Sequence, residues 1–188
     1  MPTIVHEFDW PDRVVVGTVG RPGSRSFYLQ VRTGSRVVSV GLEKEQSAVL
    51  AEKIDEILDE LMVTEGNAFS VPAVIPVELV DNEPLDQPVD EEFRAGAMSL
   101  GWDPSTAQVV IEAFPVEVVE AFDEADDDPS ELLAIEPAEV LLLKMPVGTA
   151  RAFAKRTREI VGAGRPLCPL CGSPMDAGGH VCADTDGL

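Results

Sequence analysis

The feature that most limits the fold of this chain is an order of segments that occurs twice. Residues 38–58 begin with an apolar run of strand character and continue with apolar positions at helical spacing, and residues 141–161 do the same. Aligned without gaps, the two stretches match strand with strand and helix with helix. The matched helix positions include Leu50 with Phe153, Ala51 with Ala154, and Ile57 with Ile160. This order predicts an α+β fold.

Two further strand segments precede the repeated stretch in each half. In the first half they are separated by R-P-G-S, and T-G-S then forms a hairpin turn before the third strand. In the second half D-P-S-T separates the first two strands, again as a hairpin turn. The predicted strands are residues 13–20, 26–32, 36–42, 93–102, 107–114 and 139–145, and the predicted helices are residues 43–62 and about 147–161.

The pattern predicts two tandem βββα-like units, at about residues 13–62 and 93–161, which build one sheet-and-helix body over residues 1–163. Acidic, proline-rich connections are expected at residues 67–90 and 116–137. The alternative is that a strand followed by a helix is a common local order, and that the match between the two halves is a coincidence.

The charge of the chain is strongly negative and unevenly placed. Asp and Glu outnumber Lys and Arg by 34 to 14, which gives a formal net charge of −20 and should repel polyanions at long range. The largest concentration of basic residues lies in the second helix and just after it. These residues are Arg151, Lys155, Arg156, Arg158 and Arg165. We therefore expect an acidic body that carries a basic C-terminal helix.

The N-terminus, M-P-T-I-V-H-E-F-D-W, has no basic region and no long apolar run, so it does not resemble a signal peptide. The longest apolar stretch elsewhere, near residues 140–143, is far too short to cross a bilayer. We expect a cytoplasmic protein without membrane contact.

All three cysteines and one of the two histidines lie in the segment C-P-L-C-G-S-P-M-D-A-G-G-H-V-C. A tight turn between Cys168 and Cys171 can direct both thiolates at one ion. His180 and Cys182 are two positions apart, so in an extended segment their side chains face the same side. Three sulfurs and one nitrogen make a closed tetrahedral set that suits zinc. The sequence therefore predicts one zinc ion in a zinc knuckle at residues 164–188.

Two alternatives to zinc remain for these cysteines. C-P-L-C could be a redox dithiol or could bind iron, but a redox C-x-x-C normally lies between a strand and a helix, whereas here a helix precedes it. The odd third cysteine argues against simple disulfides in a cytosolic protein. With four protein ligands no coordination position remains for water, so the predicted zinc is structural and supplies much of the folding free energy of this short segment.

No group of residues in the sequence indicates a catalytic site. The glycine-rich G-T-V-G-R-P-G lacks the Gly-Lys-Ser/Thr of a P-loop and is followed by a strand rather than a helix. His6 lies near Asp9, Asp12 and Arg13 in the sequence and could act in acid–base chemistry. Because no recognisable nucleophile accompanies it, a surface or edge histidine is the favoured interpretation.

Several of these motifs together resemble an actinobacterial family of unknown function, the one numbered 3090. The matching motifs are W-P-D-R-V-V-V-G-T-V-G-R-P-G-S-R-S-F-Y-L-Q, R-V-V-S-V-G-L-E-K-E-Q-S-A-V-L-A-E, F-R-A-G-A-M-S-L-G-W-D and G-R-P-L-C-P-L-C-G-S-P-M-D, in this order over nearly the whole chain. The family ends in a similar cysteine–histidine segment, onto which Cys168, Cys171, His180 and Cys182 map. Its members often continue with an Arg/Asn-Gly-Tyr tail, where this chain has A-D-T-D-G-L. The resemblance implies no activity, but the family's genes tend to lie beside genes for a histidine-phosphatase-like protein and a kinase-like protein.

Three classes of function follow from these features. An enzyme is the least favoured, because histidines are few and the predicted metal site is closed. Nucleic-acid binding is supported by basic residues beside a zinc knuckle. It is opposed by the net charge and by the alternative that the basic helix docks on the protein's own acidic surface. We favour a non-enzymatic protein-interaction or regulatory role, in which the knuckle and the preceding helix contact another protein with a basic surface. The neighbouring phosphatase-like and kinase-like gene products are candidate partners.

Overall fold

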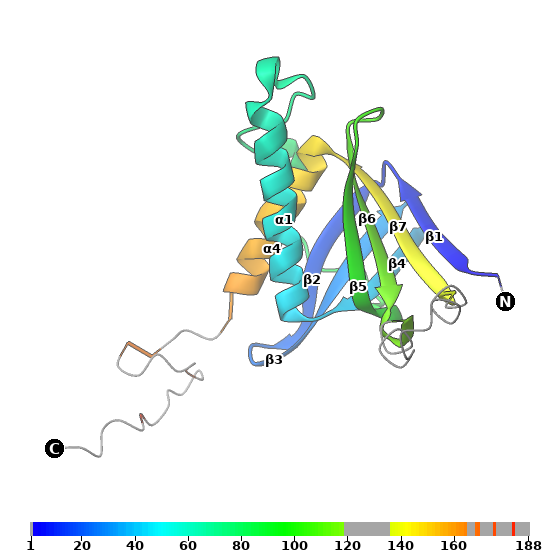
Figure 1. Cartoon of the computed structure of the whole chain (residues 1–188). Helices are drawn as coiled ribbons and strands as arrows, with labels where there is room; N and C mark the ends of the chain where they lie inside the picture. Colours follow the sequence, from blue (N-terminus) through cyan, green and yellow to red (C-terminus); the bar gives the residue numbers. More distant parts are fainter. Residues whose placement is uncertain (1, 119–135, 165–167, 170–174, 176–181, 183–188) are drawn as a thin grey trace, which may run out of the picture.

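The computed structural model describes residues 2–118, 136–164, 168, 169, 175 and 182 of the chain. Its body is a seven-stranded mixed sheet with two long helices, so the predicted α+β class is confirmed (Figure 1). The strands are β1 (Ile4–Asp9), β2 (Arg13–Arg21), β3 (Ser24–Thr33), β4 (Arg36–Leu42), β5 (Glu91–Asp103), β6 (Gln108–Pro115) and β7 (Glu139–Pro146). The helices are α1 (Lys44–Val63) and α4 (Val147–Gly162), with short 3₁₀ turns η1 (Glu65–Asn67) and η2 (Val77–Leu79).

The sheet has the strand order β1-β7-β6-β5-β4-β3-β2. Strands β2, β3 and β4 form one antiparallel meander and β5, β6 and β7 form a second. The two meanders join where β4 runs parallel to β5, and β1 adds to the far edge in parallel with β7. Each half therefore has three strands and a helix in the predicted order, while a structural repeat of the halves stays a prediction.

Strand β1 is the element that sequence patterns did not predict. Its sequence I-V-H-E-F-D is short and half polar, and only His6 and Phe8 are buried. The strand exists because it pairs with β7, where Ile4 lies opposite Glu139 and Phe8 opposite Leu143. A strand whose partner is so distant in the sequence gives a weak local signal.

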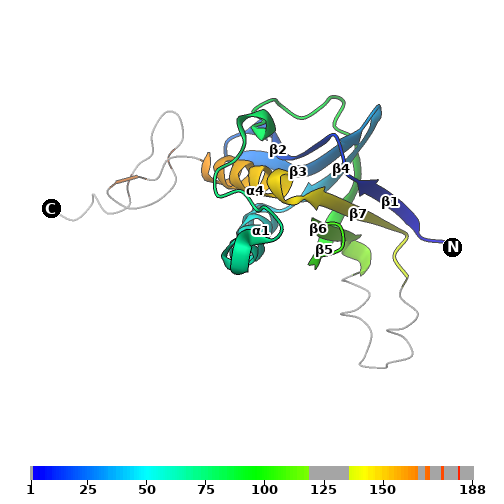
Figure 2. The ribbon, with the colours of Figure 1, turned by 90° about the horizontal axis from the view of Figure 1, so that it is seen from above.

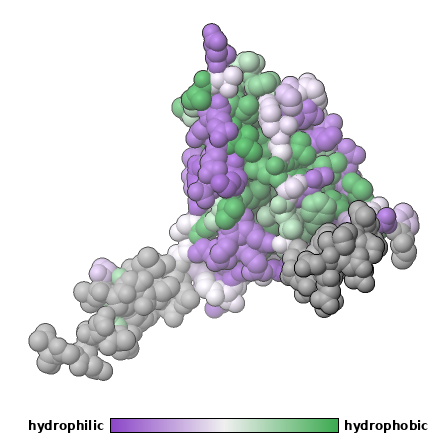
Figure 3. All heavy atoms as spheres, viewed as in Figure 1, coloured by the Kyte–Doolittle hydropathy of each residue, from purple (hydrophilic) through white to green (hydrophobic). Residues whose placement is uncertain are grey.

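The helices α1 and α4 lie side by side and pack against the sheet (Figures 1 and 2). Helix α1 starts after Glu43, whose backbone N–H donates to Oε1 of Gln46 at 2.8 Å, as in a capping box. Hydrophilic residues line the outer side of α1, and hydrophobic residues gather over the strands beside it (Figure 3). The buried helix residues are Ser47, Leu50, Ala51, Ile54 and Leu58 in α1, and Ala150, Arg151, Phe153, Ala154 and Thr157 in α4.

The connection between α1 and β5 is held against the body in spite of its proline-rich, acidic composition. Leu85 is buried over β2, and a Cβ atom added to Gly17 would lie 2.5 Å from the Leu85 side chain. Gln30 is also buried, and its side chain exchanges two hydrogen bonds with the backbone of Asp86, at 2.7 and 3.0 Å. This anchoring places the charged residues of the connection beside β2 and α4.

Candidate functional site

Two of the four predicted zinc ligands lie in the described part of the chain. Cys168 is buried, and its Sγ atom lies 3.4 Å from Sγ of Cys182, 14 positions later in the sequence. Two thiolates on one tetrahedral zinc ion, with bonds of about 2.3 Å, lie about 3.8 Å apart. The two sulfurs are thus close enough to ligate the same ion. Cys171 and His180 lie outside the described residues.

The basic helix is fastened to the body by Arg151. The Nη1 and Nη2 atoms of Arg151 donate to the carboxylates of Asp55 and Asp59 on α1, both at 2.8 Å. Its Nε atom donates to the carbonyl oxygen of Pro72, and its side chain is only 11% exposed. Asp55 and Asp59 are four positions apart on one face of α1, which is the spacing that lets two carboxylates share one guanidinium.

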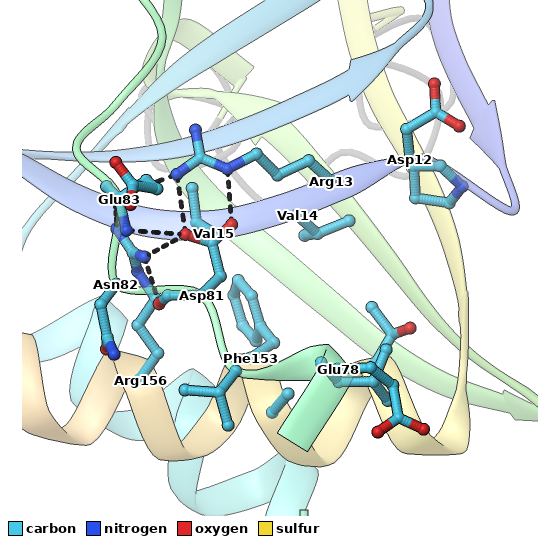
Figure 4. A pocket seen from close by; sticks show the side chains of 15 residues that line it. Asp12, Arg13, Val14, Val15, Glu78, Asp81, Asn82, Glu83, Phe153 and Arg156 are labelled. Carbon is cyan, nitrogen blue, oxygen red and sulfur yellow. Dashed lines mark hydrogen bonds and ion pairs between the residues drawn. The ribbon is translucent and has the colours of Figure 1, made fainter. Parts of the chain in front are cut away.

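A second arginine of the helix, Arg156, converges with Arg13 of β2 on the carboxylate of Asp81 (Figure 4). Nε of Arg13 donates to Oδ2 at 2.6 Å, and Nη1 of Arg156 donates to Oδ1 at 2.7 Å. Further donors reach the carbonyl oxygens of Val16 and Glu83. The side chains of Arg13 and Arg156 are 9% and 11% exposed, so two positive charges are almost buried beside one carboxylate.

The pKa values in this network reflect both the ion pairs and burial. The hydrogen bond from Arg13 holds the pKa of Asp81 below its ordinary value, and the two positive charges add to this effect. The same hydrogen bond raises the pKa of Arg13. Burial lowers the pKa of Arg156, because the cost of desolvating its charge exceeds the attraction of Asp81. Arginine remains protonated in proteins, so the network is ionised at neutral pH.

A cavity of about 460 Å³ lies beside this network and is lined by Val15, Glu78 and Phe153 as well as by the charged residues (Figure 4). The guanidinium groups that border it already donate to Asp81 and to backbone carbonyl oxygens. These guanidinium groups therefore use their N–H donors on residues 81–84 rather than on a ligand. We interpret the network as a structural fastening of the connection onto β2 and α4.

These contacts change the expected character of the basic helix. The sequence left open whether the helix presents its positive charges to a partner or docks on the protein's own acidic surface, and Arg151 and Arg156 point into the body. Lys155 pairs with Glu159 on the same helix, and Arg158 pairs with Asp55. Arg165 lies outside the described residues. The positive charges of the four described basic residues of α4 are therefore largely neutralised by the protein's own carboxylates.

His6 lies on the edge strand β1, as one part of the sequence interpretation expected, but it is buried rather than on the surface. It is only 8% exposed, and its Nε2 atom lies 2.9 Å from Oε2 of Glu139 and 3.9 Å from Oε1 of Glu92. These partners come from β7 and β5. The parallel pairing of β1 with β7 brings them together, and no sequence signal near His6 indicates it.

The body is thus an α+β sheet-and-helix unit whose charged side chains fasten the connection and α4 to the sheet. A family of proteins described as "Protein of unknown function (DUF3090)" matches residues 6–182, so the chain belongs to this family and the resemblance of its motifs is confirmed. Comparisons with curated proteins and with solved structures gave no match. Among the described residues, no helix combines the length and apolar character needed to span a membrane.

Proposed function

We propose that this chain is a zinc-binding, non-enzymatic protein-interaction or regulatory factor, with one structural zinc ion on Cys168, Cys171, His180 and Cys182. The observation that carries the proposal is the 3.4 Å separation of the Cys168 and Cys182 sulfurs. This separation supports a site in which the first and last cysteines of the segment ligate the same ion. Four protein ligands close the coordination sphere, so the ion stabilises a surface rather than activating water.

The docking of α4 indicates which part of the C-terminal region meets a partner. Arg151 and Arg156 bind carboxylates of the body, so the buried side of the helix has no free surface to offer. The contact surface is therefore the metal-held segment, together with the exposed side of α4, where Glu159 and Asp55 offset the charges of Lys155 and Arg158. A segment that folds around a metal ion can present short loops in a fixed conformation without a core of its own.

A basic protein surface is the partner that the charge of the chain favours. The net charge of −20 attracts a positively charged partner and repels nucleic acid. The internal pairing of the helix arginines weakens the nucleic-acid alternative further. The order of β2 to β4 with α1, and of β5 to β7 with α4, supports the two tandem βββα-like units as the body that carries this segment.

The test is binding of purified candidate partners, beginning with the phosphatase-like and kinase-like proteins whose genes neighbour those of the family. Wild-type protein is compared by calorimetry with Cys171→Ser and with Ser173→Ala, a matched change that leaves the four ligands in place. We expect wild type and Ser173→Ala to bind the partner with an affinity that survives nuclease treatment and falls as the salt concentration rises, and we expect no binding by Cys171→Ser. Circular dichroism checks that the body of each variant is folded.

Two outcomes would reject the proposal. Retention of nucleic acid alone by the wild-type protein would favour the nucleic-acid alternative, and turnover of a substrate by the isolated protein would make it an enzyme. If the Cys171→Ser variant bound a protein partner with unchanged affinity, partner binding would not depend on the zinc segment, and that part of the proposal would be wrong.

A further inference from the structure

Three metal-ligating side chains meet at one end of the sheet, far in the sequence from the cysteines. The Nε2 atom of His6 and one carboxylate oxygen each from Glu92 and Glu139 lie within 4.8 Å of one another. The shortest separation is 2.9 Å, between His6 and Glu139, and Oε1 of Glu92 lies 3.9 Å from the same imidazole nitrogen. The three residues belong to β1, β5 and β7, so only the folded sheet brings them together.

The fold holds the imidazole in place on the inner face of the sheet. Side chains alternate between the two faces of a strand, so His6 shares a face with the buried Phe8, and Glu139 shares a face with the buried Leu141. The His6 ring also lies near the ring of Phe93, with the centroids 6.5 Å apart. The cluster therefore sits at the end of the apolar core, where burial restricts the movement of the nitrogen ligand.

A cavity of about 640 Å³ opens beside this cluster. Glu92 and Glu139 line it together with three more carboxylates, those of Glu91, Glu117 and Glu136. Of the lining residues in the described part of the chain, only Arg94 is basic, and it pairs with Glu91 at 3.1 Å and with Glu43 at 3.0 Å. The carboxylates of Glu92 and Glu139 lie within 4.8 Å of each other and repel, and a bound cation would remove this repulsion.

We propose that His6, Glu92 and Glu139 bind one divalent transition-metal ion whose remaining coordination positions face the cavity. An imidazole combined with carboxylates suits manganese, iron or zinc better than calcium or magnesium, which prefer oxygen ligands alone. Ligand atoms bound at about 2.1 Å in a tetrahedral site lie about 3.4 Å apart. The 2.9 and 3.9 Å separations lie on either side of this value, so small side-chain movements complete the site.

A simple hydrogen bond between His6 and Glu139 accounts for only part of this geometry. It explains the 2.9 Å contact, but it does not explain why a second carboxylate, that of Glu92, approaches the same nitrogen from another strand. Nor does it compensate the charge of the Glu92 carboxylate, which has no hydrogen bond to the imidazole. The site does not depend on the cysteines, and its ligands are harder than thiolates, so a hard ion such as Mn²⁺ can distinguish it from the cysteine site.

The probe is Mn²⁺, because thiolate sites bind it poorly whereas imidazole and carboxylate ligands accept it. Full-length protein with its zinc in place is titrated with Mn²⁺ and followed by electron paramagnetic resonance. We expect one Mn²⁺ per chain, and an affinity at least about tenfold weaker in Glu139→Gln. The matched control is Glu112→Gln, which removes the same charge from β6 at a carboxylate bound to Ser99, and it should change the affinity less than about twofold.

Nuclear magnetic resonance of the wild type decides the question even if the Glu139 variant fails to fold. The chain has two histidines, and a His6→Gln variant assigns their imidazole signals. Substoichiometric Mn²⁺ should broaden the His6 signals before those of His180. The proposal is overturned if the wild type binds no Mn²⁺, if His180 broadens first, or if Glu139→Gln and Glu112→Gln bind Mn²⁺ equally well.

Discussion

Replacing Asp81 with alanine should destabilise the protein strongly, because it removes the carboxylate shared by two nearly buried arginines. Asp81 accepts hydrogen bonds from Arg13 at 2.6 and 3.0 Å and from Arg156 at 2.7 Å. Without it, two like charges stay close together with side chains only 9% and 11% exposed. The connection between η2 and β5 would also lose its main attachment to β2 and α4.

Removing one partner of a buried ion pair costs about 3–5 kcal/mol of unfolding free energy. The lower end applies here, since the Asp81 side chain is itself 29% exposed, Arg13 keeps Asp86 at 3.4 Å, and Arg156 keeps the carbonyl oxygens of Val16 and Glu83. We therefore expect a loss of about 3 kcal/mol. For a chain of this size, a loss of 1 kcal/mol lowers Tm by about 2–4 °C, so Tm should fall by about 6–12 °C.

The assay is urea denaturation of the wild type, Asp81→Ala and Asp59→Ala, followed by circular dichroism. Asp59→Ala is the control, because Asp59 also accepts from an arginine at 2.8 Å, but its side chain is 63% exposed and Arg151 keeps Asp55. The control should lose less than about 1 kcal/mol. Equal losses in the two variants, or a loss below about 1 kcal/mol for Asp81→Ala, would refute the structural role of the network.

Three further predictions follow from the structure. The pKa of Asp81 is lower in the folded chain than in the unfolded chain, so the ionised carboxylate stabilises the fold fully above about pH 4, and this contribution is lost as the pH falls further. Asp81→Asn should therefore flatten the acid side of a plot of unfolding free energy against pH. Gly17→Ala should cost about 1–3 kcal/mol in urea denaturation, because its Cβ meets Leu85 at 2.5 Å, whereas Gly101→Ala, with Val110 as nearest neighbour at 4.0 Å, should be tolerated. Chelation of zinc should increase amide hydrogen exchange at Cys168 and Cys182 while the far-ultraviolet circular dichroism of the sheet stays unchanged; a loss of sheet signal would show that the metal stabilises the whole body.

The sequence predicted those elements that have a strong local pattern. Strands β2, β4 and β6 have runs of β-branched residues, hairpin-turn sequences separate neighbouring strands, and both helices have apolar residues at helical spacing. The six strands and two helices were therefore located within a few residues. Strand β1 was missed because half of its six residues are polar and its stability comes from pairing with β7. The formation of β1 therefore depends on its tertiary pairing rather than on local strand propensity.

The clusters of charged residues were harder to predict, because their members come from distant parts of the chain. Asp81 lies in an irregular connection with no periodic pattern, and nothing near it in the sequence indicates that Arg13 and Arg156 meet there. His6 and Glu139 are 133 positions apart and meet only through the parallel register of two strands. The cysteines differ, because the spacing on which the zinc proposal rests is local and visible in the sequence.

The most direct test of the zinc proposal is X-ray absorption spectroscopy at the zinc edge, on protein purified without added metal and carrying one zinc per chain. Glu139→Gln is used in parallel, so that metal at the His6 cluster does not contribute to the spectrum. The proposed ligands Cys168, Cys171, His180 and Cys182 predict three sulfur atoms at about 2.3 Å and one nitrogen atom at about 2.0–2.1 Å. A first shell of only nitrogen and oxygen, or one with fewer than three sulfurs, would contradict the proposed site.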